Sequence, residues 1–192
     1  MGGKCDGYSV LLHILMMRPQ FSGVHCCFIN RAGVETFVIS LTAGEGGSRG
    51  TATSREELAE VRRAEFAAAC KILKVSYGEV LGYSDGDLYE VPPNRPIADL
   101  AYRIRRIRPQ ILITFGPDGG TGHADHSMAS VFATHAFHWA ARGDRFSEQL
   151  STGVTLHPGA EAVLCDIGVR LSRTADTLSG ADQRNPGYPR LC

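Results

Sequence analysis

Two histidines and an aspartate fall within four residues of a glycine-rich segment, residues 116–126, which reads Gly-Pro-Asp-Gly-Gly-Thr-Gly-His-Ala-Asp-His. Imidazole is a common zinc ligand, and a carboxylate can orient a ligating ring through its second nitrogen. The spacing of His123, Asp125 and His126 therefore indicates a metal site. In a purely structural alternative, His123 caps a turn and Asp125 caps the helix that follows.

A second glycine-rich segment, residues 42–50, reads Thr-Ala-Gly-Glu-Gly-Gly-Ser-Arg-Gly. It fails the GxGxxG template for a nucleotide, because Arg49 occupies the place of the third glycine and Glu45 would repel a phosphate. We expect a flexible turn here. Arg49 and Asp118, on the two glycine-rich segments, are candidates for binding a polar substrate, although both also suit exposed surface positions.

Regular elements must position these loops, and the middle of the chain alternates between strand and helix patterns. This alternation predicts an α/β fold, a three-layer Rossmann-like architecture with a mostly parallel sheet and helices on both faces. Ligands in such folds bind beyond the carboxyl ends of the strands, where both glycine-rich loops would lie. The expected strands are 35–42, 79–83 and 111–115. The first expected helix begins at a capping box at 54–57, and the second runs from Pro96 to Arg108 with its arginines pointing outward. A third helix is expected from near His126 to near Ala141.

The two ends of the chain are less regular than its middle. Residues 10–30 include a stretch without a clear period, and beyond about residue 157 the pattern predicts only a short strand near Val163. We therefore predict one domain over residues 1–156 with an atypical stretch at 10–30. An atypical and poorly ordered tail is predicted over residues 157–192.

Composition narrows the class of protein. The chain has 192 residues, of which 43% are hydrophobic, and 20 basic residues balance 20 acidic ones. This balance gives no electrostatic reason to expect a nucleic-acid partner, and no apolar run is long enough to span a membrane. The beginning of the chain lacks the pattern of a signal peptide. The six cysteines include no CxxC pair, so we expect free thiols in a cytoplasmic protein.

Several motifs follow one another in order, at residues 31–34, 41–46, 62–65 with 67–73, 81–86 and 123–126. Together they resemble the PIG-L/LmbE-like N-deacetylases, zinc enzymes that remove acetyl groups from N-acetylglucosamine-type sugars. The resemblance covers roughly residues 31–156. It implies that His126 is a metal ligand, that Asp125 is its acidic neighbour, and that His123 stabilises the oxyanion or protonates the leaving amine.

One motif of the family is absent. The family's first strand ends in His-Pro-Asp-Asp-Glu, which supplies two further metal ligands and a catalytic base. Here the corresponding residues are His13-Ile-Leu-Met-Met17, so His13 can serve as a ligand but Leu15 and Met16 replace carboxylates. Neither side chain offers Zn²⁺ or another divalent metal an oxygen donor. We therefore expect weak or no activity from this chain.

A shift of reading frame would explain the missing motif. Codons for His13 to Arg18, read from each third base, can spell His-Pro-Asp-Asp-Glu. Codons for residues 161–166, read from each second base, can spell Lys-Leu-Tyr-Tyr-Ala-Thr, which is similar to a late strand of the family. We hypothesise that residues near 10–30 and from about 157 onward are out-of-frame products, which the coding DNA would test.

Three functions remain open from the sequence. The first is a zinc-dependent N-deacetylase acting on a small amino-sugar conjugate, and the second is a non-catalytic relative that binds a sugar or peptide without metal. The third, a nucleotide-binding α/β enzyme, is disfavoured by the failed glycine template. His135 and His138 are expected to be core or surface residues, and the sequence does not specify an oligomeric state.

Overall fold

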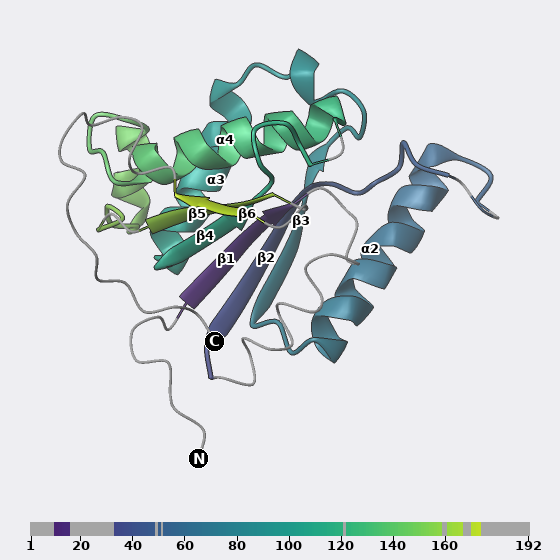
Figure 1. Cartoon of the computed structure of the whole chain (residues 1–192), viewed down its shortest axis with the longest axis horizontal. Helices are drawn as coiled ribbons and strands as arrows, with labels where there is room; N and C mark the ends of the chain where they lie inside the picture. The colour runs from purple at the N-terminus through teal and green to yellow at the C-terminus, as the bar shows by residue number, and fades with distance from the viewer. Residues whose placement is uncertain are drawn as a thin grey trace.

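The computed structural model describes one six-stranded sheet with helices packed against it (Figure 1). Its strands are β1 (Val10–Leu15), β2 (Glu35–Thr42), β3 (Tyr77–Tyr83), β4 (Ile111–Thr114), β5 (Glu161–Asp166) and β6 (Arg170–Arg173). Its helices are α2 (Arg55–Ile72), α3 (Asn94–Ile107) and α4 (Ala124–Ala140), with short 3₁₀ segments η1 (Leu88–Glu90) and η2 (Ser147–Thr152). The described residues are 10–15, 33–48, 50, 52–120, 122–158, 161–166 and 170–173, with backbone alone for β1, β5 and β6.

The sheet is parallel except at one edge. Its strand order is β3-β2-β1-β4-β5-β6, and only β5 and β6 pair antiparallel. The chain moves outward from β1 through β2 to β3, then returns to the other side of β1 with β4. The predicted α/β class with a mostly parallel sheet is confirmed, and the finer description as a Rossmann-like fold stays a prediction.

Both faces of the sheet are covered. Figure 1 shows α2 on one side of the sheet and α3 and α4 on the other. Because side chains alternate along a strand, β2 contributes Val38 to the core beneath α2 and Ile39 to the core beneath α3 and α4. Gly78 lets α2 approach β3 closely, since a Cβ atom there would lie 2.5 Å from the Cys70 sulfur. The Cys70 thiol is free, as expected.

The predicted capping box at the start of α2 forms in modified form. The Ser54 hydroxyl accepts a hydrogen bond from the Glu57 backbone N–H at 3.2 Å, as the pattern predicts. The Glu57 carboxylate, however, accepts hydrogen bonds from the N–H and hydroxyl of Thr53, one residue before the predicted partner. These bonds lower the pKa of Glu57.

Arg105 corrects the expectation that the arginines of α3 point outward, because only 1% of its surface is exposed. The last carbonyl groups of a helix have no partner within the helix, and a guanidinium offers several N–H donors in one plane. The Arg105 guanidinium supplies N–H donors to the carbonyl groups at the end of α4 and in the turn after it. It donates to the carbonyl oxygens of Trp139, Ala140, Arg142, Arg145 and Phe146 and to the side-chain oxygen of Gln149.

The predicted strand near Val163 is present as β5, and the antiparallel strand β6 was not predicted. Both strands belong to the segment predicted to be an atypical tail, most of which lies outside the described residues. The domain boundaries at 1–156 and 157–192 stay predictions. Among the described helices, none combines the length and the apolar composition needed to cross a membrane.

Candidate active site

The carboxyl ends of the parallel strands bring three loops to one edge of the sheet. The loop after β2 (residues 43–48), the loop after β3 (84–87) and the loop after β4 (115–123) all lie there (Figure 1). β1 and β4 are neighbours at the position where the strand order reverses. Such a reversal is where open α/β sheets bind ligands. The loop after β4, which was predicted to carry the site, therefore lies next to the switch point, the position between β1 and β4 where the strand order reverses.

His123 begins α4 as its N-cap residue and is exposed. Its Nδ1 atom accepts a hydrogen bond from the Asp125 backbone N–H at 3.2 Å. Because an accepting nitrogen carries no proton, the neutral ring has its proton on Nε2 and can donate from that atom. The structural alternative was therefore partly wrong, since the cap of α4 is His123 rather than Asp125.

His126 lies on the first turn of α4 with its ring stacked on Phe115, at 4.3 Å between centroids. Its Nδ1 atom is 3.1 Å from the Gly119 carbonyl oxygen, which can only accept, so Nδ1 carries the proton. The Nε2 atom of the neutral ring then carries a lone pair, as a metal ligand requires. Gly119 has φ +71, and a Cβ atom there would lie 2.8 Å from the His126 Cβ.

The structure brings the two histidine rings together. Their centroids are 5.0 Å apart, with 33° between the ring planes. In the neutral rings, Nε2 of His123 carries a proton and Nε2 of His126 carries a lone pair, and the backbone partner of each Nδ1 atom fixes this difference. One ring is suited to bind a developing negative charge and the other to bind a metal ion. The roles assigned to them from the resemblance stay predictions.

Asp125, between the two histidines, is fully buried. Its Oδ2 atom accepts a hydrogen bond from the Gly86 N–H at 2.6 Å, and its Oδ1 atom accepts one from the Leu88 N–H at 3.2 Å. The carboxylate therefore joins the first turn of α4 to the loop after β3. Its predicted catalytic role is not tested by this geometry, which shows a positioning function.

Sequence reasoning missed a second carboxylate group at this edge, formed by Glu45 and Asp85. The Asp85 carboxylate accepts hydrogen bonds from the Thr42 hydroxyl at 3.1 Å and from the Gly46 N–H at 2.9 Å. The Asp85 N–H donates to Oε1 of Glu45 at 2.9 Å, whereas Oε2 of Glu45 is buried without a partner in the described structure. The sequence signal that could have revealed this group is an acidic residue next to a glycine shortly after the end of β2 and again after β3.

The remaining predicted site residues are less defined. Arg49 lies outside the described residues. The backbone of His13 pairs with Val38 and Ile113 inside β1, two residues before that strand ends, and its side chain is not described. Asp118 is exposed and accepts a hydrogen bond from the Gly120 N–H at 3.0 Å, which stabilises the local turn. Among the described side chains, no three metal-ligating residues converge.

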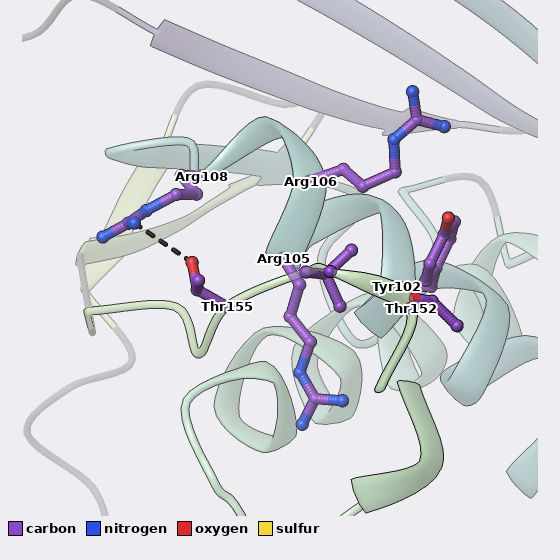
Figure 2. A pocket seen from close by; sticks show the side chains of 8 residues that line it. Tyr102, Arg105, Arg106, Arg108, Thr152 and Thr155 are labelled. Atoms are coloured by element: carbon purple, nitrogen blue, oxygen red, sulfur yellow. Dashed lines mark hydrogen bonds between the residues drawn. The ribbon is translucent and has the colours of Figure 1, made fainter. Parts of the chain in front are cut away.

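A cavity of about 310 Å³ lies at the opposite end of the sheet, between the last turns of α3 and residues 152–155. Figure 2 shows that the guanidinium groups of Arg105, Arg106 and Arg108 point in three different directions. Arg108 donates to the Thr155 hydroxyl at 3.1 Å, and Arg105 is bound to carbonyl groups. Because these charges do not converge, the cavity lacks the character of an anion site, and the histidine pair remains the candidate active site.

This α/β architecture, with a histidine pair at the switch point, matches a known family. Residues 21–137 match the PIG-L family, described as GlcNAc-PI de-N-acetylase. Because the match extends over more than half of the chain, the chain belongs to this family.

Two curated relatives agree with this assignment. A mycothiol S-conjugate amidase of Streptomyces coelicolor is 34% identical over 136 residues, which cover 60% of this chain and 46% of the relative. A 1D-myo-inositol 2-acetamido-2-deoxy-alpha-D-glucopyranoside deacetylase of Catenulispora acidiphila is 33% identical over 128 residues, covering 55% of this chain and 42% of the relative. The chain therefore spans less than half the length of both relatives.

Solved structures share the fold. The N,N'-diacetylchitobiose deacetylase of Pyrococcus horikoshii matches with a TM-score of 0.75 and 21% identity, over 84% of this chain and 61% of that protein. A 4-carboxy-2-hydroxymuconate hydratase, GalB, from Pseudomonas putida matches with a TM-score of 0.66 and 19% identity, over 81% of this chain and 65% of that protein. Because these two proteins are named for different reactions, the shared fold alone does not specify the chemistry.

Proposed function

We propose that this chain is built to hydrolyse the N-acetyl group of a small N-acetylglucosamine-type amino-sugar conjugate, with Zn²⁺ or another divalent metal as cofactor. Family membership and the names of its relatives support the reaction class. The observation that carries the proposal is the pair of rings at the switch point, one presenting an N–H donor and the other a lone pair. A cytoplasmic location is part of the proposal.

The chain's own residues would act as follows. The Nε2–H of His123 would donate a hydrogen bond to the amide oxygen as it becomes an oxyanion, an interaction typically worth about 3 kcal/mol. The other role that the resemblance gives His123, protonating the departing amine, would require the imidazolium form of the ring. His126, and His13 by resemblance, would hold the metal. When bound, the metal would polarise the amide carbonyl and activate a water molecule near neutral pH.

The fit of this donor set to zinc is partial. Catalytic zinc sites use three protein ligands, whereas this sequence offers two imidazoles and places Leu15 and Met16 where the family has carboxylates. The same two residues favour a second candidate function, a sugar-binding relative without catalysis. A metal-binding experiment separates the two.

The decisive test restores the acidic residues. We expect the double variant Leu15→Asp, Met16→Asp to bind zinc more tightly by calorimetry than the parent chain and to release more acetate from N-acetylglucosamine conjugates. Leu15→Asn with Met16→Asn is the matched control, because it introduces similar polarity without charge. Unchanged zinc affinity in the Asp variant would overturn the assigned position of His13. Sugar binding without acetate release by the restored variant would support the second candidate.

A further inference from the structure

Tyr89 is an exposed aromatic residue on a rigidly held segment of the site edge. It lies on η1, where 58% of its surface is exposed, whereas the preceding Leu88 is fully buried in the core. The burial of Leu88 fixes the orientation of η1, so the Tyr89 ring is directed to the surface. Because most of the Tyr89 ring is exposed, the ring adds little to the stability that apolar burial gives the core.

The backbone of η1 is bonded to the first turn of α4, the helix that begins at His123. The Leu88 N–H and the Gly86 N–H both donate to the carboxylate of Asp125, which lies between His123 and His126 in the chain. Tyr89 therefore follows immediately after a residue fixed to the start of α4. The site and the exposed ring are held in one arrangement.

Carboxylates flank Tyr89 in the chain, at Asp87 and Glu90. Interaction with Glu90 raises the pKa of the Tyr89 phenol most, and the charges of Asp87 and Asp125 raise it further. More than half of the Tyr89 surface is exposed. An apolar face bordered by hydrogen-bond acceptors complements a pyranose ring, which has C–H groups on its faces and hydroxyl groups around its edge.

We propose that Tyr89 is a specificity-determining residue on which the sugar ring of the substrate stacks. This inference rests on the proposed function and adds to it a preference for a cyclic acetamido sugar over an open-chain acetamide. The neighbouring carboxylates of Asp87 and Glu90 accept hydrogen bonds from the sugar hydroxyls, and the acetamido group extends toward the histidine pair. Tyr89 acts in binding and not in the chemical step.

The test measures binding of N-acetylglucosamine and of the open-chain N-acetylethanolamine by ligand-observed NMR titration. We expect Tyr89→Ala to weaken binding of the sugar about five- to tenfold and to leave binding of the open-chain amide unchanged. Tyr89→Phe should retain most of the affinity because it keeps the ring. Tyr77→Ala is the matched control, since Tyr77 is also exposed and close to a glutamate, Glu79, but lies at the start of β3.

The outcomes separate the two proposals. If the parent chain binds the sugar and Tyr89→Ala binds it equally well, or if Tyr77→Ala weakens binding as much, the role of Tyr89 is wrong while the proposed function stands. If the folded parent chain shows no affinity for the sugar, the proposed substrate class fails and the role of Tyr89 fails with it. Circular dichroism confirms that each variant is folded.

Discussion

The two ends of the sheet are held together by opposite chemistry. At the carboxyl edge, the Asp125 and Asp85 carboxylates accept hydrogen bonds from backbone N–H groups of neighbouring loops. At the amino edge, the Arg105 guanidinium donates to backbone carbonyl groups at the end of α4. The carboxyl edge thus uses two acidic side chains, and the amino edge one buried arginine, to satisfy backbone groups that helices and loops leave without partners.

The difference between the ends indicates where ligand chemistry can occur. The Arg105 donors are directed to protein carbonyl groups, so this charge serves the fold. At the carboxyl edge, aspartates bind backbone N–H groups, and His123 and His126 form the backbone bonds described above through their Nδ1 atoms. Four substitutions and conditions test this comparison, from the largest expected effect to the smallest.

Arg105→Met should be the most destabilising change. It leaves several buried carbonyl groups without donors, each costing about 1–3 kcal/mol, so we expect a loss of about 3–5 kcal/mol in the free energy of unfolding. Urea denaturation measures this loss. Arg106→Met is the control, because Arg106 is exposed and its replacement should change stability by less than about 0.5 kcal/mol. Equal effects of the two substitutions would show that Arg105 does not hold the amino edge.

Asp125→Asn should lower the free energy of unfolding by about 2 kcal/mol. The amide has only one acceptor oxygen, so its NH₂ group would face the N–H of Gly86 or Leu88. Urea denaturation again gives the stability, and amide exchange at Gly86 and Leu88 reports the loosened loop. Asp87→Asn serves as the control, since Asp87 makes no capping hydrogen bond to η1. Unchanged exchange at both amides would contradict the proposed connection.

Gly119→Ala should destabilise the loop beneath His126 by about 1–2 kcal/mol more than Gly122→Ala. Both glycines have positive φ, so an alanine would strain the backbone to a similar degree at either position. Only at position 119, however, would the added Cβ atom lie closer than 3 Å to other atoms. The NMR signal of the His126 ring should shift in the first variant and remain in place in the second. Matching stabilities for the two variants would show that contact at position 119 is tolerated.

His157 should give the smallest effect, a pH dependence of stability from the amino edge. It is buried, it donates from Nε2 to the Pro109 carbonyl at 2.7 Å, and its Nδ1 has no partner among the described residues. Burial, and then the charge of Arg108, lowers the pKa of His157 below its ordinary 6.5.

The unfolded chain therefore binds more protons at this residue than the folded one, and the resulting stability is lost as the pH falls below about 6.5. We expect the melting temperature of the parent chain to fall more between pH 7 and pH 5 than that of His157→Gln. The opposite order would contradict the assigned protonation.

The sequence predicted the features that follow from local periodicity. The strand at 35–42, the helix beginning after Ser54 and the buried face of α3 were all found, because apolar spacing encodes them directly. The burial of Arg105 was missed, since the pattern cannot show that the end of a distant helix needs donors. An arginine is expected to be exposed from its residue type alone, and only contacts with distant parts of the chain can bury its side chain.

The sequence predicted the position of the histidine pair in the sheet more successfully than the hydrogen bonds around it. A histidine pair after a buried strand predicted the correct edge of the sheet, because parallel topology fixes where strands end. The contacts of Asp125 with Gly86 and Leu88, and of Asp85 with Thr42 and Gly46, join residues about forty positions apart. No short motif encodes such pairings. The role of His13 also depends on the frame of the coding DNA, which the polypeptide alone does not contain.

The two hydrogen bonds of Asp125 have a consequence for protein engineering. Because one carboxylate is bonded to the loop that carries Asp85 and lies on the helix that carries the imidazoles, a substitution at Asp125 would disturb both parts at once. A substitution at an exposed position of η1 would leave this connection intact. Under the proposed function, directed evolution toward a new conjugate should accordingly begin at exposed positions on η1.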